Sequence, residues 1–207
     1  LKSAGEDKLD LGILLSEEPC EWAATYTDNK IKSSSIDYCK EIEGKIKGII
    51  VNSGSANCCV GYQGLIDSRD IATKCKEIFN SKEPFLMSST GVIGVEIPVG
   101  LIMNSIEKFN LDSNGGEKFS RAIITTDSKT KNVSVNVNSK NGSYKIGGVA
   151  KGSGMIHPKM GTMLSYITTD AGLNSEDLTS LLRKSVENSF NQIDVDGDTS
   201  TNDTVVV

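Results

Sequence analysis

The dipeptide Gly161-Thr162 carries the chemistry that best suits the composition of this chain. A small residue before Thr lets the backbone strain until the Thr162 hydroxyl attacks the preceding carbonyl carbon. Hydrolysis of that ester would leave Thr162 as a new N-terminus, whose free α-amine could act as the base for its own hydroxyl. This chemistry needs no histidine, cysteine or metal, so Gly161-Thr162 is a candidate self-cleavage site and Thr162 a candidate nucleophile.

The acidic segment Asp194–Thr199 indicates a different chemistry, because it carries carboxylates at three alternate positions. An EF-hand loop requires glycine at its sixth position, whereas Gly197 is the fourth residue here. The segment is similar to that of haloacid-dehalogenase-type phosphatases, with Asp194 as nucleophile and Asp196 as acid/base, although Asp198 replaces their usual Thr or Val. A metal-dependent phosphatase that uses these aspartates is therefore an alternative reading.

Composition excludes several other classes of site and of protein. The chain has 207 residues, a formal net charge of −5, one histidine and five cysteines, and the cysteines form no CxxC pair. A single histidine excludes a His-rich metal centre, and this cysteine usage favours a reducing compartment. The acidic balance disfavours nucleic-acid binding, and no apolar run approaches the ~18 residues of a membrane span. We therefore expect no metal, no nucleic-acid partner and no membrane contact.

Alternating strand and helix patterns are expected to position the candidate residues. Apolar runs predict strands at 11–15, 46–51, 85–87 and 204–207. Helical spacing of apolar residues predicts helices at about 65–80, from 98, and from 174 or 175. Alternation at 133–137, followed by Asn141-Gly142, predicts a hairpin that returns through 144–146. The mixture indicates an α/β or α+β domain.

Five ordered motifs resemble ornithine acetyltransferase of the bacterial type, also called the bifunctional glutamate N-acetyltransferase of arginine biosynthesis. Together they are far more specific than any one alone, and they extend over nearly the whole chain. The motifs are Asn52–Cys58, Ser89–Gly94, Thr125–Asp127, Lys151–Ile156 and Asp196–Thr204. The family protein is considerably longer, and this chain begins without Met and stops within an apolar run. We therefore expect residues 1–207 to be the N-terminal portion of one acetyltransferase unit.

The resemblance implies a reaction and a processing step. The family precursor cleaves itself before the Thr that matches Thr162, which would divide this chain into an α chain, 1–161, and the start of a β chain, 162–207. That Thr takes the acetyl group from N2-acetyl-L-ornithine, as an acyl-enzyme, and passes it to L-glutamate. No cofactor is implied, although some members also accept acetyl-CoA as a donor substrate.

The resemblance also implies roles for individual residues. Thr90 and Gly91 match the residues that stabilise the oxyanion, while Thr125, Lys151 and Thr162 match substrate-contacting positions. Donors aimed at a developing oxyanion are often the largest catalytic contribution, about 3–4 kcal/mol each. A lysine such as Lys151 can pair with a substrate carboxylate as a point charge.

The implied fold is a self-processing, layered α-β-β-α sandwich of the DmpA-like kind. The implied partners are the α and β chains of one precursor, associated as a dimer of αβ units. The implied location is the cytoplasm, or the mitochondrial matrix or a plastid in a eukaryote. Two residues depart from the family pattern before the nucleophile. Lys159 replaces the usual Asn, and Gly161 replaces Ala, which loosens the scissile peptide and could slow cleavage.

Two further alternatives follow from the same residues. An aminopeptidase or amidase of the same architecture would use water as the acceptor in place of glutamate. A non-catalytic domain could keep the fold without any cleavage at Thr162.

Overall fold

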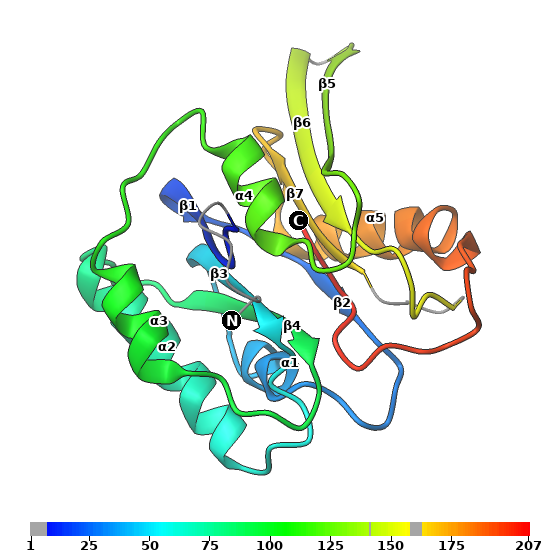
Figure 1. Cartoon of the computed structure of the whole chain (residues 1–207). Helices are drawn as coiled ribbons and strands as arrows, with labels where there is room; N and C mark the ends of the chain where they lie inside the picture. The colour runs from blue at the N-terminus through cyan, green and yellow to red at the C-terminus, as the bar shows by residue number, and fades with distance from the viewer. Residues whose placement is uncertain (1–7, 141, 158–162) are drawn as a thin grey trace.

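The computed structural model describes residues 8–140, 142–157 and 163–207, and these residues form two β-sheets (Figure 1). The first sheet has three strands in the order β1-β3-β4: β1 (Leu11–Cys20), β3 (Ile46–Ser55) and β4 (Phe85–Val92). β1 runs antiparallel to β3, whereas β3 and β4 are parallel. The carboxyl ends of β3 and β4 therefore lie at the same edge of the sheet.

The second sheet has five strands in the order β2-β8-β7-β6-β5. Its strands are β2 (Ala24–Tyr26), β5 (Lys131–Ser139), β6 (Gly142–Lys151), β7 (Leu164–Thr169) and β8 (Thr204–Val206). β7 and β8 are parallel, and the other pairs are antiparallel. Lys151 pairs with Leu164, which in turn pairs with Thr204. This row of the sheet brings the end of β6 beside the residues that follow the predicted cleavage site.

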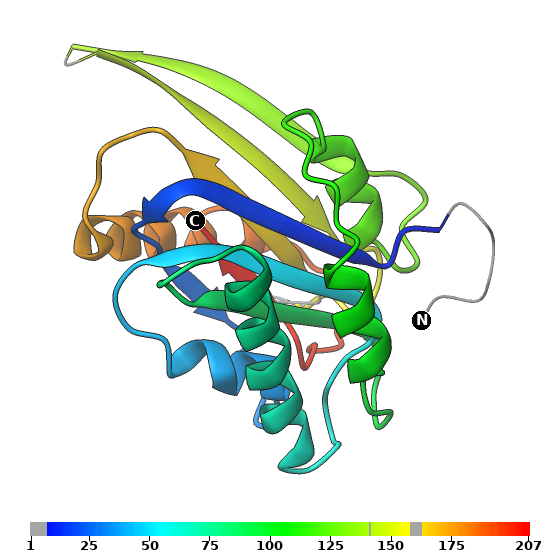
Figure 2. The ribbon, with the colours of Figure 1, turned by 90° about the vertical axis from the view of Figure 1, so that its left-hand side faces the viewer.

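The helices cover the outer faces of the two sheets (Figure 2). Three of them lie on the first sheet: α1 (Ser34–Lys40), α2 (Gln63–Ile78) and α3 (Val99–Ile106). α5 (Ser175–Glu187) packs on the second sheet, where its buried Leu178, Leu182 and Val186 meet Val205. α4 (Gly116–Ile123) contacts strands of both sheets. The layers are helix, sheet, sheet, helix, so the α-β-β-α prediction is confirmed.

Apolar side chains from both sheets share one core, which contains Ile50, Phe85 and Leu86 of the first sheet and Leu164 and Tyr166 of the second. Burying each side chain of this kind stabilises the folded state by about 2 kcal/mol. β3 is buried along most of its length, as expected for a strand covered on both faces. The strands that lead to the polar edge are thus held rigidly.

An aromatic contact locks α4 against the second sheet. The rings of Phe119 and Tyr166 meet edge to face, with their centroids 5.5 Å apart. Gly12 of β1 makes room for this contact, because a Cβ there would lie 2.9 Å from the Phe119 ring. The packing fixes the end of α4 and therefore the polar loop that follows it.

Most predicted elements are confirmed, including the hairpin and the two strands at 46–51 and 85–87. The Asn174 side chain accepts a hydrogen bond from the Asp177 N–H at 2.8 Å, so it caps α5 as the sequence suggests. The predicted stop of the first strand after Leu15 is wrong, since β1 continues through Pro19 to Cys20. β1 is an edge strand, and edge strands tolerate proline because one side needs no N–H donor.

Five elements of the described residues were not predicted as such: α1, α4, β2, β7 and the 3₁₀ helix η1 (Phe190–Gln192). These elements are short, or follow glycine-rich sequence, so their apolar residues repeat over too few positions to identify a helix or strand. α4, for example, buries only the stripe Phe119, Ala122 and Ile123, with Ser120 beside it. Within the described part of the chain, no helix has the length and apolar character needed to cross a bilayer.

Candidate active site

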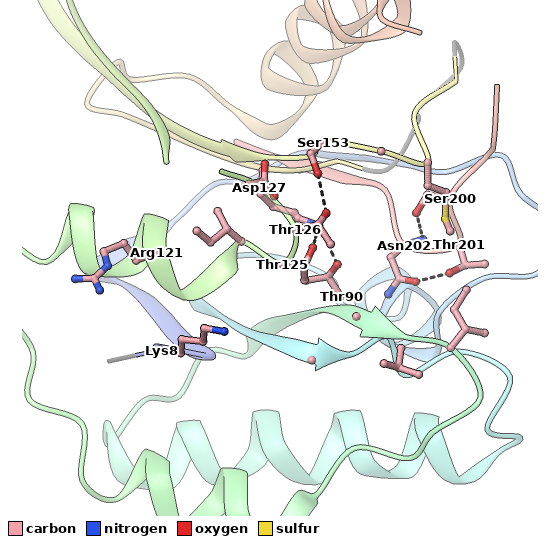
Figure 3. A pocket seen from close by; sticks show the side chains of 18 of the residues that line it. Lys8, Thr90, Arg121, Thr125, Thr126, Asp127, Ser153, Ser200, Thr201 and Asn202 are labelled. Atoms are coloured by element: carbon pink, nitrogen blue, oxygen red, sulfur yellow. Dashed lines mark hydrogen bonds between the residues drawn. The ribbon is translucent and has the colours of Figure 1, made fainter. Parts of the chain in front are cut away.

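A cavity of about 760 Å³ lies where the polar ends of several strands and loops meet (Figure 3). Its walls come from the end of β4, the loop after α4, the end of β6 with the residues that follow, and the segment before β8. These pieces are far apart in the sequence and carry four of the five motifs singled out above, together with Gly54 of the remaining one. The site is therefore assembled by the packing of the two sheets.

Thr90 and Gly91 reach the cavity from the end of β4. Gly91 pairs with Gly54 of β3 and has a φ of +132°, a backbone conformation that side chains rarely adopt. A Cβ on Gly91 would lie 2.3 Å from the Gly54 carbonyl carbon. Glycine is thus required at position 91 by both the conformation and the close approach of the two strands.

Lys151 links the predicted site residues to one another. Its ammonium group donates hydrogen bonds to the Thr90 Oγ1 at 3.2 Å and to the Thr125 Oγ1 at 3.0 Å. The Lys151 side chain is buried, and Figure 3 shows Thr90 and Thr125 close together in the cavity. Since each threonine oxygen accepts from Lys151, each hydroxyl hydrogen is left to point elsewhere. The structure brings Thr90, Gly91, Thr125 and Lys151 together, as the resemblance implied.

Asp127 anchors the loop that carries Thr125 and was not assigned a role from the sequence. Its Oδ1 accepts the Gly152 N–H at 2.8 Å and is also bound by the Lys131 ammonium. Burial raises the pKa of Asp127, but Lys131, the Gly152 N–H and Lys151 outweigh it and hold the pKa below its ordinary value. The carboxylate therefore stays ionised and fixes the chain immediately after Lys151.

Asn202 joins the two sheets beneath the cavity and was likewise missed. Its side-chain amide donates to the carbonyl oxygens of Ala56 and Ser89, both at 2.7 Å, while its Oδ1 accepts from the Thr201 hydroxyl at 2.5 Å. The Asn202 side chain is buried. The motif Asp196–Thr204 contained the signal, but a sequence cannot show that this amide crosses to the other sheet.

The predicted nucleophile Thr162, with Lys159 and Gly161, lies outside the described residues. The nearest described neighbours are His157 before it and Met163 after it. The Met163 N–H donates to the Asp203 Oδ1 at 2.7 Å. Burial raises the pKa of Asp203 to about 7, against the opposing effects of the Met163 N–H, Ser200 and Lys151. A fully buried carboxyl group that accepts the Met163 N–H is a feature that sequence reasoning did not find.

The acidic segment does not have the arrangement that a phosphatase would need. The two oxygens of Asp196 accept main-chain N–H groups from Met155 and Ile156, so the carboxylate is engaged by the protein itself. Asp194 lies 3.6 Å from the Nδ1 of His157, on the exposed surface. Among the described residues, no group of three or more His, Cys, Asp or Glu side chains could hold a metal ion. The engagement of both Asp196 oxygens by main-chain N–H groups counts against the phosphatase alternative, which needs Asp196 as a free acid/base.

Solved structures share this fold. A crystal structure of arginine biosynthesis bifunctional protein ArgJ from Bacillus halodurans aligns over 74% of this chain and 82% of its own, at 37% identity and a TM-score of 0.69. An ornithine acetyltransferase from Mycobacterium tuberculosis, solved with ornithine, aligns over 72% and 82%, at 27% identity and a TM-score of 0.64. An aminopeptidase from Ochrobactrum anthropi, described as a variant of the Ntn hydrolase fold, shares the fold at 11% identity and a TM-score of 0.52.

Sequence relatives agree with the structural ones. The arginine biosynthesis bifunctional protein ArgJ of Thermotoga neapolitana is 49% identical over 96% of this chain, and that of Bacillus anthracis is 44% identical over 96%. The chain covers 51% and 50% of these two proteins, so it spans about half the length of the curated relatives it matches. The model of the ArgJ family matches residues 1–207, and the chain belongs to the ArgJ family.

Proposed function

We propose that the protein to which this chain belongs is a glutamate N-acetyltransferase of arginine biosynthesis. It moves an acetyl group from N2-acetyl-L-ornithine to L-glutamate, without a bound cofactor. The names of the relatives support the pathway, and the ornithine in the Mycobacterium tuberculosis structure supports the donor. The observation that carries the proposal is the Lys151 ammonium between Thr90 and Thr125 in the cavity.

The first step is self-cleavage between Gly161 and Thr162. The Thr162 hydroxyl oxygen bonds to the Gly161 carbonyl carbon, the peptide C–N bond breaks, and the freed amine takes the proton. Water then hydrolyses the ester and leaves a Gly161 carboxylate and a free Thr162 amine. The products are an α chain, 1–161, and a β chain that begins at residue 162.

The lengths of the solved chains support two separate polypeptides. The alignment uses 74% of this chain to cover 82% of the Bacillus halodurans chain, so that chain is somewhat shorter than this one. The Thermotoga neapolitana relative, by contrast, is only 51% covered. A solved polypeptide much shorter than a full-length relative is what cleavage would produce.

We propose that the two chains assemble as a dimer of αβ units in the cytoplasm, a reducing setting that suits five free cysteines.

Acetyl transfer then proceeds in two half-reactions at Thr162. Its hydroxyl attacks the acetyl carbonyl of N-acetylornithine, its amine relays the proton to the leaving ornithine amine, and an acetyl ester forms. The glutamate amine attacks that ester, N-acetylglutamate leaves, and the Thr162 hydroxyl is restored. Thr90 and the Gly91 N–H stabilise the oxyanion in each half-reaction. Lys151 polarises the Thr90 hydroxyl, which makes it a better donor, and with Thr125 attracts the substrate carboxylate.

Acetyl transfer by the full-length protein tests the proposal. Incubation with labelled N-acetylornithine alone should leave the acetyl group on the peptide that begins at Thr162, detectable by mass spectrometry. Addition of glutamate should discharge it as N-acetylglutamate. Thr162→Ala protein should remain uncut and unlabelled. Release of free acetate at the same rate with and without glutamate would instead support the aminopeptidase or amidase alternative, in which water is the acceptor.

A further inference from the structure

The carboxylates Asp196 and Asp203 of the segment Asp194–Asp203 have no assigned role in the acetyl transfer described above, yet they contact the chain on both sides of the predicted cleavage site. On the upstream side, the Asp196 Oδ2 accepts the Met155 N–H at 2.5 Å, and its Oδ1 accepts the Ile156 N–H at 2.8 Å. The Val195 N–H returns a hydrogen bond to the Ile156 carbonyl at 2.9 Å. The residues that approach the scissile bond are thus held by both side chain and main chain.

On the downstream side, the first described residue after Thr162 is held in the same manner. The Asp203 Oδ1 accepts the Met163 N–H at 2.7 Å, and the Thr204 N–H donates to the Met163 carbonyl at 3.0 Å. Asp203 is fully buried, so the bond to Met163 is shielded from water. Met163 is covalently joined to Thr162, and its position therefore limits where the Thr162 hydroxyl can lie.

The segment itself is anchored strongly enough to act as a support. Its end continues into β8, which lies inside the second sheet between β2 and β7. Asn202 ties it to the first sheet through the Ala56 and Ser89 carbonyls. At its other end, the Gly197 N–H donates to Asp194 at 3.2 Å and the Asp198 N–H to Asp196 at 3.4 Å, which folds the acidic loop on itself.

We infer that Asp194–Asp203 is a clamp that aligns the Gly161–Thr162 bond for self-cleavage, with Asp196 and Asp203 as its positioning residues. The inference rests on the proposed function, because it concerns the cleavage step of that reaction. Holding both flanks reduces the conformational freedom of the short stretch between them. Such restriction raises the effective concentration of an intramolecular nucleophile, here the Thr162 hydroxyl, at the carbonyl that it attacks.

The charges of the two carboxyl groups are consistent with these roles. The Met155 N–H, helped by the Ile156 N–H, lowers the pKa of Asp196, so its carboxylate is ionised and is a strong acceptor. Asp203 differs, because burial raises its pKa to about 7. Either protonation state of Asp203 keeps an oxygen that can accept the Met163 N–H, so the hydrogen bond, not the charge, is what the clamp requires there.

A time course of self-cleavage in the full-length protein tests the clamp, followed by intact mass and gel analysis. Asp196→Ala and Asp203→Ala should each slow cleavage by about tenfold or more, since each leaves main-chain N–H groups without acceptors. Asp203→Asn keeps an acceptor oxygen and should cleave within about threefold of wild type. Asp198→Ala is the matched control: its side chain is exposed in the same loop, and its loss should leave the rate unchanged.

The outcomes separate the clamp from the proposed function. A wild-type protein that never cleaves would overturn the proposed function, and the clamp with it. If wild-type protein cleaves itself, and Asp196→Ala protein has the same cleavage rate and the same melting temperature, the clamp alone is overturned. If Asp203→Ala does not fold, Asp203→Asn decides: a folded Asn variant that stays uncut would show that an acceptor at position 203 is not sufficient and would overturn its assigned role.

Discussion

In the cavity, Lys151 joins side chain to side chain, whereas in the clamp Asp196 and Asp203 join carboxylates to the main chain. Lys151 binds two threonine hydroxyls and leaves their hydrogens available to a substrate. Asp196 and Asp203 bind N–H groups of Met155, Ile156 and Met163, which are fixed parts of the chain itself. The first arrangement suits a group that must interact with changing substrates. The second suits a group that must hold one segment still.

This contrast teaches that two activities of one protein can be separated by substitution. Changes in the cavity should lower acetyl transfer more than self-cleavage, because they remove groups that contact the substrate. Changes in the clamp should lower self-cleavage more than transfer by molecules that have already been cut.

Thr90→Ala should have the largest effect, lowering kcat by ~10²–10³ with little change in KM. The substitution removes a hydroxyl donor that strengthens its interaction only as the oxyanion forms, while the Gly91 N–H remains. The measurement is steady-state acetyl transfer by protein confirmed as cleaved. Thr90→Ser keeps the hydroxyl and serves as the control. A cleaved Thr90→Ala enzyme with the wild-type kcat would remove Thr90 from the oxyanion site.

Lys151→Met should lower kcat/KM by ~10–10², mostly through KM, because a hydrogen bond to a charged group contributes about 1.5–3 kcal/mol. Methionine keeps much of the aliphatic stem while removing the ammonium that would attract the substrate carboxylate. Lys145→Met is the control, since Lys145 lies on the same strand but is exposed. An unchanged KM for N-acetylornithine in folded, cleaved Lys151→Met protein would contradict the carboxylate-binding role.

Asp203→Asn should change the dependence of stability on pH. Burial raises the pKa of Asp203 from 3.8 to about 7, so the folded state binds this proton more tightly than the unfolded state. The stabilisation from this group is fully present below 3.8 and is lost as the pH rises through about 7. Asn stays neutral, so the melting temperature of the Asp203→Asn protein should gain on that of wild type as the pH rises from 3.8 to about 7, and the difference should then stay constant. If the plots of melting temperature against pH run parallel for the two proteins over this range, the raised pKa of Asp203 is contradicted.

The double substitution Cys58→Ala, Cys59→Ala should have the smallest effect, a change in activity of less than about twofold. The two sulfur atoms lie 3.8 Å apart in the loop after β3, and burial raises the pKa of the Cys58 thiol, which suppresses the reactive thiolate. Acetyl transfer and cleavage are measured on the same preparation. A large loss of transfer in folded, cleaved protein would indicate a cysteine nucleophile and break the assignment of Thr162.

Local sequence signals were sufficient for the long elements, and the ordered motifs were sufficient for four of the residues that line the cavity. The apolar spacing of 65–80 corresponds to α2, and the apolar run at 46–51 corresponds to β3, because their periodicities extend over enough residues to be distinctive. Thr90, Gly91, Thr125 and Lys151 were found through ordered motifs and meet at one cavity. The sequence also favoured chemistry without histidine or metal, since composition alone limits the available groups.

Other features were decided only by the tertiary structure. No local pattern shows that Asn202 crosses to Ala56, that Asp203 becomes buried against Met163, or that Asp196 binds the approach to the cleavage site. The physical reason is that a hydrogen bond between distant segments depends on how the sheets pack. Burial, which also depends on that packing, then raises the pKa of Asp203, whose immediate sequence neighbours are uncharged. Residue types and their order determined the chemistry available to this protein, and the packing of its two sheets determined which groups came within reach of one another.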